Sequence, residues 1–139
     1  MKEAREAVLA KIKELLTDAI TVDGLTIPYY ADAFGDQPYG IYKESYRGEA
    51  DNSKHHFAEI AYINLVCFAR GQSEAFVAEM SRKVRGLLQA SVNSTIALTD
   101  GLQATYTRFN SIVSLTELDN GVTVHRDTLE LQLRIDEHI

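Results

Sequence analysis

Two segments of the chain repeat their apolar residues at helical spacing. In the first, the steps between apolar positions are four, three and four residues, and in the second they are three, four and three. Such steps place the side chains on one face of an amphipathic α-helix. The first stripe consists of Val8, Ile12, Leu15 and Ala19, and the second of Val77, Met80, Val84 and Leu87. The turn residues Asp23-Gly24 end the first helix, and Ser73 can cap the second.

Between these helices the pattern changes to that of extended strands. Residues 25–30 form short extended pieces, because Pro28 biases the residue before it towards the β region. After a loop, residues 39–47 alternate between two faces. We expect Ile41 on one face of this strand and both Tyr42 and Tyr46 on the other.

The segment from Phe57 to Ala69 is the most β-like in the chain. It is apolar on both faces, with Phe68 on one side and Cys67 on the other. A strand of this kind is central in its sheet, or covered from both sides. Together with residues 39–47 it predicts a long hairpin, and the tip of that hairpin, at residues 48–56, is hydrophilic.

The last third of the chain predicts a second hairpin. Residues 102–118 are rich in Thr, Ser and Tyr, and their alternation blurs near Asn110, where a bulge can shift the register. Asp119-Asn120-Gly121 is a tight-turn signal. In the closing strand the alternate apolar residues that point inward are Leu129, Leu131, Leu133 and Ile135.

These elements follow one another in the order α-β-β-β-α-β-β. They favour an α+β fold in which two helices pack on one face of a mainly antiparallel β-sheet. The 139 residues suit a single domain that spans residues 1–139. With 45% hydrophobic and 24% charged residues the chain is globular, because a disordered chain has fewer apolar residues and a larger charge imbalance.

The charge balance and the single cysteine narrow the class of protein. The net charge is −6 and the basic residues are scattered, whereas nucleic-acid-binding proteins cluster Lys and Arg. We therefore expect no sequence-specific nucleic-acid binding, although an acidic protein can form the wall of a channel for DNA. Cys67 alone excludes an intrachain disulfide, and no apolar run approaches the ~20 residues of a membrane span. We expect folding in a reducing cytoplasm and no membrane partner.

No motif in the sequence points to catalysis, a metal or a cofactor. The adjacent residues His55 and His56 would project to opposite faces of a strand, and no Cys pair or His/carboxylate motif lies nearby. We therefore expect these two histidines in an exposed loop and not in a metal site. Cys67 lies in the most apolar strand, and neither Gly-x-Ser-x-Gly nor a phosphate-binding glycine motif occurs. We therefore predict a non-enzymatic structural protein that binds other protein subunits.

The sequence concentrates tyrosines around the first hairpin, where Tyr29, Tyr30, Tyr39, Tyr42 and Tyr46 occur. Strand propensity and core filling explain part of this set, whereas outward-facing tyrosines are typical of protein interfaces. A protruding hairpin often gains order on a partner, although a long hairpin can also be merely mobile. The predicted subunit or partner interface consists of Tyr42, Tyr46, Arg47, Glu49, Asp51, Lys54 and His55.

Three local patterns occur together in one known family. In the first, a strand opens after a loop with Pro38-Tyr39-Gly40-Ile41. In the second, His56 precedes a long apolar strand that ends with Val66-Cys67-Phe68-Ala69-Arg70. Gly71-Gln72-Ser73-Glu74-Ala75 then opens a helix that ends in Leu87-Leu88. In these patterns and in its closing hairpin, residues 5–136 resemble the small tail terminator, or tail completion, minor tail proteins of long-tailed bacteriophages and related prophages. The family often closes the long strand with Trp, where this chain has Phe68.

The resemblance implies a role in virion assembly. It implies a ring, of six copies, that caps the end of the tail tube and provides the docking surface for the head connector. The implied partners are further copies of the chain, the tail tube protein and the head–tail connector protein, and no cofactor is implied. The implied location is the tail or neck of the virion, after assembly in the bacterial host cytoplasm. Two alternatives stay open, which are another head–tail joining or neck protein and a small ligand-binding regulatory module.

Overall fold

The computed structural model describes residues 4–30, 37–50, 58–92, 96–98 and 102–137. Two helices, α1 and α2, and eight strands, β1 to β8, are assigned within these ranges. The helices are α1 (Ala4–Leu16) and α2 (Glu74–Val92). The strands are β1 (Thr21–Val22), β2 (Leu25–Thr26), β3 (Tyr29–Tyr30), β4 (Tyr39–Ala50), β5 (Ala58–Arg70), β6 (Ile96–Ala97), β7 (Leu102–Asp119) and β8 (Val122–Glu137).

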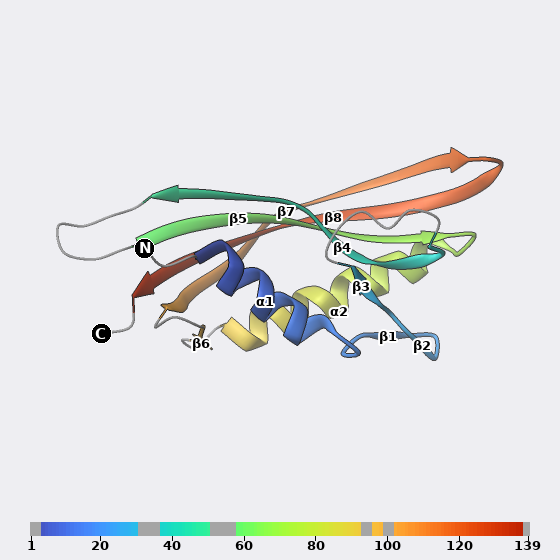
Figure 1. Cartoon of the computed structure of the whole chain (residues 1–139). Coiled ribbons are helices and arrows are strands. Elements are labelled where there is room, and N and C mark those ends of the chain that lie inside the picture. The colour runs from blue at the N-terminus through green and yellow to red at the C-terminus, as the bar shows by residue number, and fades with distance from the viewer. Residues whose placement is uncertain (1–3, 31–36, 51–57, 93–95, 99–101, 138–139) are drawn as a thin grey trace.

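One six-stranded sheet organises the molecule, in the order β3-β4-β5-β8-β7-β6. Every neighbouring pair is antiparallel except β3 and β4, which run parallel. Both helices lie on one face of the sheet, and the two long hairpins, β4–β5 and β7–β8, point to opposite ends of the molecule (Figure 1). The α+β prediction is confirmed. The additions to the predicted order are the two-residue strand β6 and the small hairpin β1–β2.

The first helix ends earlier than the sequence pattern predicts. It stops at Leu16, and Asp18 adopts a positive φ of 56° that an α-helix cannot continue. The Thr17 hydroxyl also donates to the Lys13 carbonyl oxygen at 2.5 Å, which satisfies a terminal acceptor. Ala19, expected in the buried stripe, is therefore exposed and lies outside the helix. The Asp23-Gly24 turn closes the β1–β2 hairpin instead of ending the helix.

The strand β4 contains a bulge that the alternation of the sequence does not reveal. Its register against β5 shifts between Lys43 and Ser45. Tyr46 therefore lies opposite Ile63, on the same face as Ile41, and packs against the main core. The prediction that Tyr42 and Tyr46 share a face is wrong, because one extra residue inverts the facing of every side chain that follows it.

The strand β5 is central and apolar on both faces, as predicted. It pairs with β4 on one side and with β8 on the other. On the helix face lies the main core, whose largest fully buried side chains are Leu16, Ile27, Ile41, Ile63, Leu65, Met80, Leu88, Leu102, Leu129, Leu131 and Ile135. On the helix-free face, Val66 and Phe68 of β5 are also buried, at 1% and 0% exposure. Tyr42 covers Phe68 with its ring in an edge-to-face contact at 5.7 Å between centroids.

The second hairpin has the bulge, the turn and the buried residues that the sequence predicted. A shift between Phe109 and Ser111 places a bulge at Asn110, and a second shift occurs between Ala104 and Tyr106. Asp119 pairs with Val122 across a two-residue turn, in which Asn120 and Gly121 have the positive φ angles of 53° and 80° that this turn requires. The predicted inward residues Leu129, Leu131, Leu133 and Ile135 are all buried.

The helix α2 is fixed at its start and at its middle. The Ser73 hydroxyl accepts a hydrogen bond from the Phe76 amide at 3.2 Å, which confirms the predicted N-cap. About two turns after the N-cap, the buried Ser81 hydroxyl lies 2.7 Å from a carboxylate oxygen of Asp127 on β8. The other Asp127 oxygen accepts a hydrogen bond from Ser114 of β7 at 2.8 Å. This carboxylate therefore joins α2 to both strands of the second hairpin.

Candidate assembly interface

The predicted interface residues are distributed over two faces and a segment outside the described residues. Tyr42, Arg47 and Glu49 lie on the helix-free face of β4. Arg47 stacks over the Tyr62 ring of β5, with its guanidinium carbon 4.3 Å from the ring centroid, and pairs with Glu49 at 2.6 Å. Both charged side chains are more than half exposed, so they remain accessible to a partner.

Tyr42 is half-buried on this face, and its surroundings hold it neutral. Burial raises the pKa of Tyr42, Arg126 opposes that shift, and the carboxylates of Glu44 and Glu117 add to it. The ring packs against Phe68. Tyr42 is therefore part of a small apolar cluster with one accessible side.

Tyr46 is on the helix face, and its hydroxyl has a partner inside the molecule. It donates a hydrogen bond to Glu59 of β5 at 2.5 Å, and the Arg5 guanidinium of α1 lies 5.8 Å from its ring centroid. The Glu59 carboxylate occupies the space beside Gly48, where an added Cβ would come within 2.7 Å of it. Tyr46 thus attaches the start of α1 to the first hairpin, which is a structural role that the expected outward facing did not suggest.

The remaining predicted interface residues, Asp51, Lys54 and His55, lie outside the described residues. The interface prediction for the tip of the first hairpin therefore stays a prediction.

Four arginines of the helix-free face are each paired with a carboxylate. The ion pairs are Arg47–Glu49 at 2.6 Å, Arg70–Asp119 at 2.7 Å, Arg126–Glu117 at 2.7 Å and Arg134–Asp136 at 3.2 Å. In contrast, a surface that binds the phosphates of nucleic acids has clustered Lys and Arg without acidic neighbours. The positive charge of these four arginines is therefore offset within the face itself.

The exposed large apolar side chains gather on the second hairpin, which the sequence reading did not single out. Among the described residues they are Leu25 (36%), Val113 (61%), Leu115 (52%), Leu118 (75%) and Val122 (39%). All except Leu25 belong to the distal part of β7–β8. Apolar patches of this kind often mark interaction sites. The available signal in the sequence was that Val113, Leu115 and Leu118 occur in a strand already rich in polar residues.

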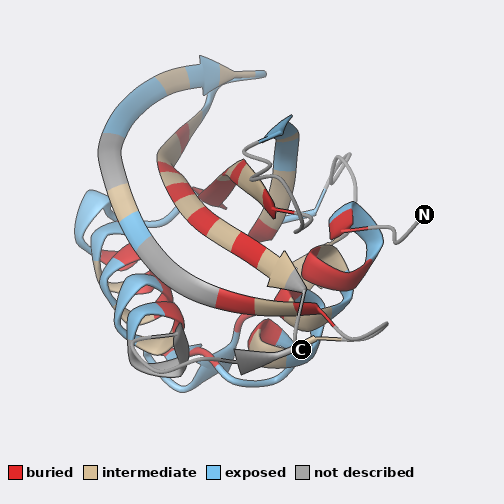
Figure 2. Cartoon of the chain, turned by 90° about the vertical axis from the view of Figure 1, so that its left-hand side faces the viewer, coloured by how far each residue is buried: buried red, intermediate tan, exposed pale blue. Residues whose placement is uncertain are grey.

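The outer sides of β7 and β4 form the two long edges of the sheet. Among the described strands, β6 covers β7 only at Gln103 and Ala104, and β3 covers β4 only at Ile41 and Tyr42. Figure 2 shows β7 as the outermost arc of the sheet, and its distal part is largely exposed. The two edges differ in charge, since β4 alternates acidic and basic residues where residues 111–116 of β7 contain none.

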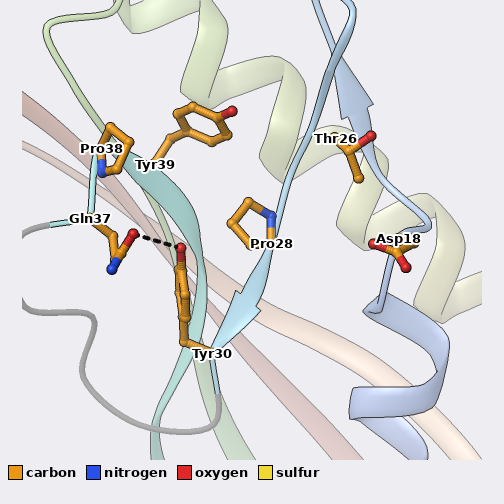
Figure 3. Close-up of a pocket in the computed structure, with 7 residues that line it drawn as sticks. All are labelled: Asp18, Thr26, Pro28, Tyr30, Gln37, Pro38 and Tyr39. Carbon is orange, nitrogen blue, oxygen red and sulfur yellow. Dashed lines mark hydrogen bonds between the residues drawn. The ribbon is translucent and has the colours of Figure 1, made fainter.

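A shallow pocket of about 360 Å³ lies where β3 and β4 begin (Figure 3). Its lining residues are Asp18, Thr26, Pro28, Tyr30, Gln37, Pro38 and Tyr39. The Tyr30 hydroxyl donates to Gln37 at 3.3 Å, and of the residues that line this pocket only Asp18 is charged at neutral pH. It lies at the margin of the sheet, not between the sheet and the helices, where the ligand-binding alternative would place it.

Two further searches of the described residues bear on other classes of function. In the ranges given above, no group of three or more His, Cys, Asp or Glu side chains is arranged to hold a metal ion. Neither described helix is long and apolar enough to cross a membrane.

Comparisons with known proteins identify a related fold. No family model matches the sequence, and no curated protein matches it. The structure superposes on a chain of the virion of a native gene transfer agent (GTA) particle with a TM-score of 0.71. The superposition covers 98% of this chain and 99% of that chain at 14% sequence identity. The two chains therefore share a fold along their whole lengths.

Proposed function

We propose that this chain is a structural subunit of a virion of phage or prophage type. The observation that carries the proposal is the end-to-end superposition on a chain from a gene transfer agent virion, with no large insertion in either chain. Because such low identity establishes only a shared fold, the functional step also rests on the resemblance of the sequence patterns to tail terminator proteins.

Within that class we propose that the chain caps the tail tube. Copies of the chain, six in the form that the resemblance implies, close the end of the completed tube as a ring and present a surface for the head connector. Its partners are further copies of itself, the tail tube protein and the head–tail connector, and its place is the tail or neck of the virion. The function needs no reacting group, since it consists of burying protein surface against neighbouring subunits.

The electrostatics of the chain support a ring through which DNA can pass. The net charge is −6, and four arginines of the helix-free face are each within 3.2 Å of a carboxylate. A channel wall of this kind does not bind the phosphates of DNA and so does not retain the DNA. We expect no sequence-specific DNA binding by the isolated protein.

Deletion of the gene from the phage or prophage that encodes the chain tests this proposal. Electron microscopy of the particles should show tail tubes of uncontrolled length that do not join heads. A copy of the gene supplied in trans should restore normal particles, and mass spectrometry should find the protein in them. Tails of normal length without heads would favour the neck-protein alternative. Normal, infectious particles in the absence of the protein would contradict the proposal.

A further inference from the structure

The distal outer edge of β7 lacks the features with which natural proteins protect an exposed strand. Exposed edges usually carry Lys, Pro or a bulge that discourages pairing with another chain. Residues 111–116, Ser-Ile-Val-Ser-Leu-Thr, contain no charge, no Pro and no Gly. The nearest bulge, between Phe109 and Ser111, lies before this stretch. Val113 and Leu115 within it are 61% and 52% exposed. Such an edge is suited to receive another strand.

The opposite edge of the same sheet has the other character. From Lys43 onwards no described strand pairs with the outer side of β4, and this part of the strand alternates in charge. Its charged residues are Lys43, Glu44, Arg47 and Glu49, which sum to zero. A bulge between Lys43 and Ser45 bends its start. The charges and the bulge disfavour pairing of β4 with most strands. A strand whose charges complement those of β4 could still pair with it.

We propose that the distal edge of β7 binds the β4 edge of a second copy of this chain, so that the sheets of neighbouring subunits are continuous. The proposal rests on the ring proposed above and names the surface through which its subunits join. It includes Arg47 and Glu49, which the sequence analysis predicted to be interface residues, on one side of the contact, and adds Val113 and Leu115 on the other.

The polarity of the strands supports this pairing. Along the sheet, β4, β5, β8 and β7 alternate in direction, so β4 and β7 of one subunit are antiparallel. A rotation about an axis that follows the strands preserves strand direction. The β4 strand of the next copy would therefore meet β7 antiparallel, which is the more stable arrangement. Each copy would use one edge of each kind, and such head-to-tail contacts close into rings when the rotation allows.

The charges at the ends of the two edges also match in the antiparallel arrangement. The edge of β7 begins near Arg108 and ends near Glu117 and Asp119, whereas that of β4 begins at Lys43 and ends near Glu49. Antiparallel pairing brings the basic start of each edge towards the acidic end of the other. Parallel pairing would instead bring Lys43 towards Arg108. Opposite charges across neighbouring strands stabilise a pair, and like charges destabilise it.

Pairing of β7 with β7 of a second copy is the main competitor. It is also antiparallel and would also bring Arg108 towards Asp119. However, such a contact is symmetric, closes after two copies and leaves both β4 edges unused. Cross-linking of engineered cysteines separates the two arrangements.

The test uses Ser45→Cys and Val113→Cys, which alter exposed side chains on the helix-free face of the two edges. The native Cys67 is fully buried and does not compete for the reagent. Particles that contain the single or double variants are treated with a short bismaleimide, which tolerates small differences in register, and are then denatured. A ladder of multimers from the double variant, with monomers from either single variant, is expected.

The other outcomes would overturn the inference. Dimers from Val113→Cys alone would show β7–β7 pairing, and cross-links to a protein of different mass would show a different occupant. Monomers only, from particles that contain the double variant, would show that the edges do not meet. If the protein is absent from the particles, the proposed function fails. The same cross-linking of concentrated purified protein then decides the inference independently, because monomers there would also overturn it.

A charge-insertion variant gives a second readout. In the double variant Val113→Lys and Leu115→Lys, pairing would desolvate two ammonium groups on an edge that is now protected. We expect incorporation into particles to fall about tenfold or more, corresponding to at least ~1.4 kcal/mol. Leu25→Lys, which alters an exposed leucine of the β1–β2 hairpin outside the six-stranded sheet, is the matched control and should incorporate normally. Circular dichroism and thermal melting verify that each variant folds. Normal incorporation of the folded double variant would contradict the inference.

Discussion

The two long hairpins of this protein are built in opposite ways. The β4–β5 hairpin is buried through much of its length, because β5 is central and its apolar residues are covered on both faces. Its exposed outer edge is charged. The β7–β8 hairpin is buried in the half near Leu131 and Ile135, and its distal half carries exposed Val113, Leu115 and Leu118. The hairpin with the charged outer edge is therefore the more deeply embedded, and the hairpin with an uncharged stretch on its outer edge presents the apolar surface.

Composition and exposure point to different hairpins as the surface that another subunit would cover. The tyrosines and charges of the first hairpin led to the prediction of an interface there. In the structure, Tyr46 packs against the core and Tyr42 covers Phe68. The polar composition of β7 gave no indication of an interface on the second hairpin. The exposure of apolar side chains and the absence of a neighbouring strand instead point to the outer edge of β7, as proposed above.

The largest loss of stability should result from a substitution in the buried first hairpin. Phe68→Ala removes a fully buried ring from the helix-free face of β5, and we expect a loss of about 3–5 kcal/mol in the free energy of unfolding. Leu118→Ala, at a side chain that is 75% exposed on the other hairpin, should change stability by less than about 0.5 kcal/mol. Urea denaturation measures both. Equal losses would show that the distal half of β7–β8 is packed more tightly than the structure indicates.

An intermediate effect is expected where the second hairpin is joined to α2. Asp127→Ala removes the carboxylate acceptor shared by Ser81 and Ser114 and leaves the buried Ser81 hydroxyl with weaker, uncharged partners, the Val77 carbonyl oxygen at 3.0 Å and the Cys67 thiol. We expect a loss of about 1–3 kcal/mol, because a buried polar group loses a strong partner. Asp127→Asn, which retains an acceptor oxygen, is the control and should lose less. Equal behaviour of the two variants in denaturation would contradict a hydrogen-bonding role for the carboxylate.

The smallest effect concerns the pH dependence of stability through Cys67. Burial raises the pKa of the Cys67 thiol to about 12, with a hydrogen bond from Ser81 opposing the shift and the Asp127 charge adding to it. The unfolded chain has the ordinary thiol pKa of 9.0, so above that pH the unfolded chain loses a proton that the folded chain retains. Stability contributed by the neutral thiol is complete below pH 9 and falls as the pH rises towards 12, by at most ~1.4 kcal/mol per pH unit.

Denaturation at pH 8 and pH 10 checks this dependence. Between these values the wild-type protein should lose about 1 kcal/mol more than a Cys67→Ala variant, which lacks the titrating thiol. A thiol reagent should correspondingly react with Cys67 slowly in the folded protein and rapidly after unfolding. Rapid reaction of the folded protein would show that this strand is accessible and would also complicate the cross-linking described above.

The sequence by itself determined much of this protein. The helical stripes predicted two helices on one face, the apolar character of residues 57–69 predicted a central strand, and the alternation of residues 129–135 predicted the buried face of β8. The turn at Asn120-Gly121 and the bulge near Asn110 were also predictable. Each of these features follows from residues close to one another in the chain, because side-chain periodicity and turn conformation are local properties.

The tertiary structure alone decided the rest. The bulge between Lys43 and Ser45 arises from pairing with β5, and it moved Tyr46 to the helix face against the expectation from strict alternation. Likewise, only the order of the strands shows that β7 and β4 are the long edges of the sheet and that Val113 and Leu115 lie on one of them. The facing of side chains beyond a bulge and the position of a strand at the edge of the sheet depend on pairing with residues far apart in the chain, so a local pattern cannot encode them.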